Sequence, residues 1–144
     1  MQYLPIIVAG LIPMALGFVW YHKAVFGQAW MDSLGFTEKD LASGNMGLTM
    51  GLAALLSMML SLAIKGTFFG VHGGEAALIE AGDLNFGHGA FHGLLIGGMI
   101  GIPVLVTNGL FEKKTMKNLL INAAYWLVAI SLMNGLLAAW HIPA

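Results

Sequence analysis

The chain has 144 residues, of which 58% are hydrophobic and only 9% are charged. A water-soluble domain of this length would expose far more charge, so the composition indicates a membrane protein. The formal net charge is −1 and all six basic residues are lysines, which leaves no basic patch for nucleic acid. Cysteine is absent, which excludes disulfides, thiolate metal ligands and thiol nucleophiles.

Four apolar stretches are each long enough to cross a bilayer as a helix, which takes about 20 residues. We expect spans at about 3–22, 46–69, 88–111 and 118–140, within a single domain that covers residues 1–144. The predicted fold is therefore an all-α, integral membrane four-helix bundle, with the spans paired as two helical hairpins in tandem. Pro13 and Pro103 lie inside the first and third spans, and each is expected to kink its helix.

The distribution of lysine predicts how the bundle is oriented. The connection after the first span carries Lys23 and Lys39, and the connection after the third span carries three more lysines at 113, 114 and 117. The connection after the second span carries none and is acidic. Because cytoplasmic loops are enriched in positive charge, we expect both termini and this acidic connection to be extracytoplasmic.

The first connection is expected to contain an interfacial amphipathic helix at about 26–34, because Phe26, Trp30 and Leu34 recur four residues apart. Gly35 should end that helix. Thr37, followed by acidic residues, is typical of an N-cap, and we expect it to begin the helix that becomes the second span.

Five short motifs, rich in aromatic residues and glycine, are spread from the first span to the fourth. They are Gly17-Phe18-Val19-Trp20-Tyr21, Phe26-Gly27-Gln28-Ala29-Trp30-Met31, Leu34-Gly35-Phe36-Thr37-Glu38, Asn108-Gly109-Leu110-Phe111-Glu112 and Ile121-Asn122-Ala123-Ala124-Tyr125-Trp126-Leu127. This set resembles a bacterial family of small four-span membrane proteins that is catalogued as a domain of unknown function, number 1761. The resemblance covers nearly the whole chain. It implies a multi-pass protein of the bacterial inner (cytoplasmic) membrane, and it implies no activity, substrate or catalytic residue.

Four glycines recur every four residues in the third span, at Gly89, Gly93, Gly97 and Gly101. In lipid, bare backbone of this kind lets a second helix come close. Each step advances the row by about 40° around the helix, so the row wraps farther than one partner helix needs. We therefore expect these glycines to form a helix-packing surface, with a second neighbour supplied by another copy of the chain or by a membrane-protein partner.

Three histidines gather near the expected outer end of the bundle. His88 and His92 are four residues apart and share one helix face, and His72 lies just before the acidic connection. Imidazole groups near carboxylates are suited to a divalent transition metal, so the sequence leaves such a metal open here while predicting no cofactor. The same groups could relay protons, or they could only bond to water, lipid headgroups or a neighbouring backbone.

The second span carries a polar row that includes Ser57, Ser61 and Lys65. One interpretation is a hydrated seam that leads to Lys65, which then pairs with an acidic residue of the connection. The alternative is that the serines bond between helices and Lys65 anchors the helix at the interface. The acidic residues of this candidate polar or ion site are Glu75, Glu80 and Asp83.

Three asparagines are interpreted as structural. Asn108 and Asn122 flank the same short turn and are expected to bond across it, while Asn134 lies near mid-span and needs one inter-helix bond.

Three functions remain open on the sequence alone. The first is an oligomeric channel or transporter for an ion or small solute, and the second is a non-catalytic accessory or scaffold subunit of a larger membrane complex. The third is divalent-metal binding at the outer face. An enzyme is not expected, and no catalytic residue is assigned, because the chain has neither a nucleophile elbow nor a phosphate-binding glycine loop.

Overall fold

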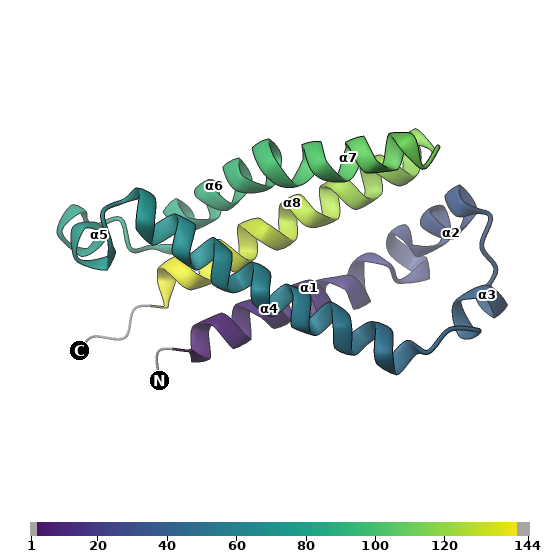
Figure 1. The fold of residues 1–144 in the computed structure, drawn as a ribbon, viewed down its shortest axis with the longest axis horizontal. Coiled ribbons are helices and arrows are strands. Elements are labelled where there is room, and N and C mark those ends of the chain that lie inside the picture. Colours follow the sequence, from purple (N-terminus) through teal and green to yellow (C-terminus); the bar gives the residue numbers. More distant parts are fainter. Residues whose placement is uncertain (1–2, 141–144) are drawn as a thin grey trace.

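The computed structural model describes residues 3–140, and the regular structure in that range is helical throughout (Figure 1). The predicted all-α bundle is confirmed. The long elements are α1 (Leu4–Trp20), α4 (Met46–Val71), the rod formed by α6 (Phe86–Ile96), η2 (Gly97–Gly101) and α7 (Ile102–Phe111), and α8 (Met116–Ala139). The short elements are η1 (Lys23–Gly27), α2 (Gln28–Leu34), α3 (Glu38–Ala42) and α5 (Glu75–Ala81).

Three of these rods are long and apolar enough to cross a membrane, namely Met46–Val71, Phe86–Phe111 and Met116–Ala139. The helix predicted at about 3–22 ends at Trp20 after 17 residues. It is followed by the helical segment Lys23–Leu34 at an angle of 60°, and the two together pass the same test. The structure therefore gives three candidate spans, or four when this bent pair is taken as one, and indicates a membrane protein.

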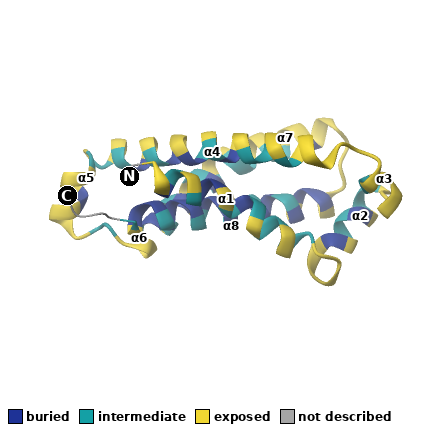
Figure 2. Cartoon of the chain, turned by 90° about the horizontal axis from the view of Figure 1, so that it is seen from below, coloured by how far each residue is buried: buried dark blue, intermediate teal, exposed yellow. Residues whose placement is uncertain are grey.

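The α8 helix lies at the centre of the bundle, packed against α6 on one side and α1 on another, while α1 also packs against α4. The core joins Ala9 of α1 and Ile64 of α4 to Ile130, Met133 and Leu137 of α8, all of them buried. Figure 2 shows buried residues along α8 and α1, and exposed residues along the outward face of α4. Large apolar side chains on such a face are suited to lipid rather than to water.

The glycine row lies against α8 from end to end. A Cβ added at Gly93 would lie 2.6 Å from the Cα of Ser131, and one added at Gly97 would lie 3.2 Å from Leu127 Cδ1. The ends of the row, Gly89 and Gly101, also face α8. The π-helical element η2 has more residues per turn than an α-helix, which turns the row back toward α8. One helix therefore covers the row, and the row gives no reason to expect a second subunit.

The first connection differs from the expected continuous helix. Thr37 does cap a helix, because Asp40 N donates to Thr37 Oγ1 over 3.4 Å and Thr37 N donates to Asp40 Oδ2 over 2.7 Å. That helix, α3, stops at Ala42, and α4 begins separately with Asn45 as its N-cap. The prediction that Thr37 begins the second span is therefore wrong, and the Gly44 that precedes Asn45 interrupts the helix. The Gly35 stop after α2 is confirmed, with a φ of 68°.

Candidate metal centre

The end of α4 places the first histidine. His72 is the C-cap of α4, and the next two residues, Gly73 and Gly74, have φ values of 76° and 100°. Residues with a side chain rarely adopt such angles, so the two glycines allow the chain to leave α4 abruptly and enter α5. The α5 helix is held on the bundle by Leu78, which is buried with Phe68 in one apolar cluster. The acidic connection is therefore folded back over the end of the bundle.

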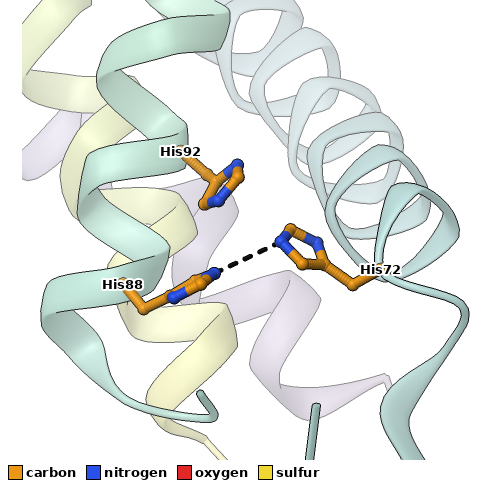
Figure 3. A group of neighbouring side chains, drawn as sticks. All are labelled: His72, His88 and His92. Carbon is orange, nitrogen blue, oxygen red and sulfur yellow. Dashed lines mark hydrogen bonds between the residues drawn. The ribbon is translucent and has the colours of Figure 1, made fainter. Parts of the chain in front are cut away.

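The start of α6 places the other two histidines. Gly82, with a φ of 72°, ends α5, and Asn85 then caps α6 by accepting a hydrogen bond from His88 N over 2.9 Å. His88 thus lies in the first turn of α6, and His92 lies one turn later on the same face. Figure 3 shows both rings directed toward His72 from the opposite helix.

The three imidazole groups form one cluster. One nitrogen from each of His72, His88 and His92 lies within 4.8 Å of the other two, and all three side chains are half-buried. The Nε2 atoms of His72 and His88 are 3.2 Å apart. The rings of His88 and His92 stack with centroids 4.7 Å apart, and the ring of His72 stands edge-on to that of His92 at 4.5 Å. The structure therefore brings together the three histidines that the sequence grouped as metal ligands.

In both His72 and His88, the ring nitrogen that points away from the 3.2 Å contact, Nδ1, has a partner of its own. His72 Nδ1 is 2.6 Å from the carbonyl oxygen of Phe68, and because a carbonyl can only accept, that nitrogen must carry the hydrogen. His88 Nδ1 is 3.4 Å from the Asp83 carboxylate, whose negative charge favours a hydrogen on that nitrogen too. Both Nε2 lone pairs then point into the same gap. Two lone pairs at this distance repel each other unless a proton or a cation lies between them.

The spacing of the cluster suits a tetrahedral metal ion. With metal–nitrogen bonds of about 2.0–2.1 Å, two ligands of a tetrahedral zinc ion are about 3.3–3.4 Å apart. The 3.2 Å between His72 Nε2 and His88 Nε2 is close to that value. The widest separation in the cluster, at most 4.8 Å, would have to shorten by about 1.4 Å, which side-chain rotation can supply. Three histidine ligands would leave a fourth position open.

Phe68 forms the apolar wall of the cluster. Its ring is 1% exposed, and its centroid lies 4.8 Å from the ring of His72 and 5.6 Å from that of His92. An apolar wall on one side restricts water and raises the strength of charge interactions in the site. Sequence reasoning missed Phe68, because one phenylalanine in an apolar span carries no signal of its own.

The residues of the predicted polar row are not part of this cluster. Ser57 is 4% exposed and Ser61 is fully buried, so they do not border open water. Lys65 and Glu75 line a separate cavity, and Glu80 is exposed on α5. Asp83, one of the three acidic residues that the sequence placed in the site, contacts His88.

The opposite end of the bundle is closed by a chain of hydrogen bonds. The hydroxyl of Tyr21 donates to Asn122 Oδ1 over 2.8 Å, and Asn122 Nδ2 donates to Asn118 Oδ1 over 3.0 Å. Asn118 Nδ2 in turn donates to Ser33 Oγ over 3.1 Å. Asn122 thus ties α8 to the segment after α1, whereas Asn108, which was expected to bond with it, has an exposed side chain.

Asn134 makes a buried bond between helices. Its Nδ2 donates to the backbone oxygen of Gly89 over 2.8 Å, where a Cβ added at Gly89 would lie 2.5 Å from the backbone oxygen of Asn134. The missing Cβ of Gly89 allows this contact, so the glycine and the asparagine act together in packing the two helices.

Comparison with known proteins places the chain in a family. Residues 4–138 match the family described as "Protein of unknown function (DUF1761)", and this range contains His72, His88 and His92. No curated protein and no solved structure matches the chain. The match covers nearly the whole chain, which confirms the resemblance carried by its short motifs. The chain therefore belongs to the DUF1761 family of proteins of unknown function.

Proposed function

We propose that this membrane protein binds one divalent transition metal ion, zinc or an ion of similar preference, on His72, His88 and His92. The observation that carries the proposal is the pair of Nε2 atoms 3.2 Å apart, with each ring held from its other nitrogen. A metal-binding histidine commonly has this arrangement, in which the second ring nitrogen bonds to a carbonyl or carboxylate and fixes the tautomer. Imidazole ligands suit zinc, copper, nickel and iron.

A purely structural role for the pair is less favourable. A direct hydrogen bond between the two Nε2 atoms needs a hydrogen on one of them. His72 already uses its neutral-state hydrogen at Phe68, so the hydrogen would come either from His88 or from a second proton on His72. In the first case His88 would carry a positive charge or turn a lone pair toward Asp83, and in the second case His72 would carry the charge. A metal ion satisfies both nitrogens at once and leaves both outer contacts in place.

Transport of that ion is the second candidate, and the position of the cluster favours it. Three protein ligands leave a fourth position open to water or to another ligand, whereas structural zinc sites are closed by four protein ligands. His92 also lies within the apolar rod Phe86–Phe111, so a bound ion would sit at the end of a candidate span.

Cobalt binding tests the proposal, because Co²⁺ adopts tetrahedral sites readily and its visible absorption reports that geometry. The full chain is purified in mild detergent, stripped with a chelator and titrated with Co²⁺, and zinc is then added in competition. We expect one equivalent of Co²⁺ to give a tetrahedral spectrum that zinc abolishes. His72→Ala and His88→Ala should lose the spectrum.

His22→Ala is the matched control, because His22 is exposed and lies beyond the other end of α1, next to η1. This variant should titrate like the parent chain. Absence of a tetrahedral spectrum in the parent chain, or its survival in both cluster variants, would contradict the proposal.

A further inference from the structure

A second feature lies at the same end of the molecule, between the beginning of α1 and the last turns of α4. It is an open cavity of about 430 Å³, within the usual range of about 300–1,000 Å³ for small-ligand sites. Its wall is mostly apolar, and it contains one cationic and one anionic side chain. The residues that matter here are Tyr3, Ile6, Leu62, Lys65, Phe69 and Glu75.

The depth of Lys65 in the bilayer follows from helix geometry. The α4 helix has 26 residues and is therefore about 39 Å long, about 9 Å more than a typical hydrocarbon core. Lys65 is six residues before the end of α4 at Val71, or about 9 Å along the axis. With the excess length shared between the two ends, its Cα lies just inside the edge of the core. The ammonium group can then reach the layer of lipid phosphates.

The shape of the cavity matches a molecule with an ionic head and an apolar tail. Lys65 Nζ lies 5.8 Å from the centre of the Phe69 ring, which holds the ammonium at the cavity wall by a cation–π contact. Leu62 and Ile6 supply apolar wall below it. Gly66 keeps the space open, since a Cβ added there would have no other atom within 4 Å. A charged side chain in a membrane span usually pairs with a polar group, so Lys65 favours a ligand with a polar head.

We infer that this cavity holds the head of a membrane phospholipid, with the phosphate on the Lys65 ammonium and the upper acyl chain along Leu62 and Ile6. Glu75 lines the same cavity, and its carboxylate favours a headgroup that carries a positive charge beside the phosphate. Phosphatidylethanolamine has that charge pattern, whereas phosphatidylglycerol has only the negative charge. This site is separate from the histidine cluster and does not depend on metal binding.

Native mass spectrometry tests the inference on the full chain, offered equal amounts of phosphatidylethanolamine, phosphatidylglycerol and diacylglycerol. We expect the parent chain to retain one phosphatidylethanolamine in preference to the other two lipids. Lys65→Gln should lower that retention by about tenfold or more, because a charge-assisted hydrogen bond is lost. Glu75→Gln should remove the preference over phosphatidylglycerol. Lys117→Gln is the matched control, since Lys117 is exposed at the opposite end of the bundle.

A second pair of variants keeps the test informative if loss of the Lys65 charge affects folding. Gly66→Leu fills the cavity without changing charge and should reduce retention as strongly. Gly70→Leu also has open space around its Cβ, but Gly70 does not line the cavity, so it should retain lipid normally. Equal retention of diacylglycerol, or unchanged retention in both Lys65→Gln and Gly66→Leu, would overturn the inference. Displacement of the lipid by millimolar inorganic phosphate would overturn it too, in favour of a simple anion site.

Discussion

His72 and His88 direct their Nε2 atoms at each other across the gap between α4 and α6, over a distance of 3.2 Å. The two residues are separated by the whole of α5 in sequence, and they meet because two consecutive glycines and a capped helix start reverse the chain between them. The remaining nitrogen of each ring lies beside an acceptor, Phe68 O or Asp83. In the function proposed above, this pair supplies two of the three ligands of a metal ion. The predictions below follow from that proposal and from the packing that supports the pair.

Asp83 should matter to metal affinity although it is not a ligand. Replacing it by Asn removes the negative charge beside His88 Nδ1, and loss of such an outer contact typically lowers metal affinity about 10–100-fold. Competition between the protein and a chromophoric chelator for zinc measures this change. Glu80→Gln is the control, because Glu80 lies exposed on the same connection and should leave affinity unchanged. Equal affinity in both variants would show that Asp83 does not orient the ring.

Zinc affinity should fall as the pH falls. A ring nitrogen binds metal only when it carries no proton, so protons and zinc compete for the facing Nε2 atoms. We expect the affinity to drop by about tenfold or more between neutral pH and pH 5.5. Isothermal titration in two buffers of different ionisation enthalpy should also show proton release on binding. An affinity that does not change with pH contradicts the assignment of histidine ligands.

Metal removal should destabilise the folded chain, because an ion on His72 and on the α6 histidines would join the ends of two helices. Binding to the folded state alone contributes about 2.7 kcal/mol when free zinc is at 100 times its dissociation constant. Thermal unfolding in detergent, with zinc and with a chelator, measures this difference. His88→Ala should unfold at the same temperature under both conditions. A zinc-induced shift in that variant as large as in the parent chain would place the stabilising ion elsewhere.

Gly93→Leu should disrupt the contact between α6 and α8. The added side chain would meet the backbone of Ile130 and Ser131, with Cβ only 2.6 Å from Ser131 Cα, and backbone cannot move aside as a flexible side chain can. We expect a loss of about 3 kcal/mol or more in unfolding free energy, measured by denaturant titration in detergent. Gly98→Leu is the control, since the nearest atom to its Cβ is a leucine methyl group 4.0 Å away. Equal stability of the two variants would mean that the helices do not pack along the glycine row.

Tyr125→Phe should weaken the contact between α1 and α8. Its hydroxyl donates to the backbone oxygen of Pro13 over 2.6 Å in a buried position. Loss of the donor leaves that acceptor without its side-chain partner, which costs about 1–3 kcal/mol. Thermal unfolding compared with Tyr3→Phe measures the effect, because the Tyr3 side chain is largely exposed. No difference between the two variants would mean that the bond contributes nothing to stability.

Local patterns were sufficient to predict the helical architecture and to group the histidines. Apolar runs of about 20 residues predict membrane helices, and a spacing of four residues places His88 and His92 on one face. The Gly35 stop and the Thr37 cap also depend on neighbouring residues, and both are present. The break between α3 and α4 was missed although Gly44 and Asn45 mark it, because the Thr37 cap was interpreted as the start of one continuous helix.

Contacts between distant segments could not be read from the sequence. Phe68 contributes its carbonyl to His72 and its ring to the cluster. No sequence pattern within an apolar span predicts either role. Asn118 and Ser33 are far apart in sequence, so their bond depends on where α2 meets α8. The helix face on which the glycines lie was also predicted incorrectly. The prediction used an α-helical period, whereas the central part of the segment, Gly97–Gly101, is π-helical.

X-ray absorption at the zinc edge, on the full chain loaded with one equivalent of zinc, is the most direct test of the metal centre. We predict three imidazole nitrogens at about 2.0–2.1 Å and one oxygen ligand from water or buffer. His72→Ala should lose one imidazole from the fitted shell, and His22→Ala should leave the shell unchanged. A shell made only of oxygen ligands, or one that is identical in the parent chain and in His72→Ala, would contradict a metal site on this cluster.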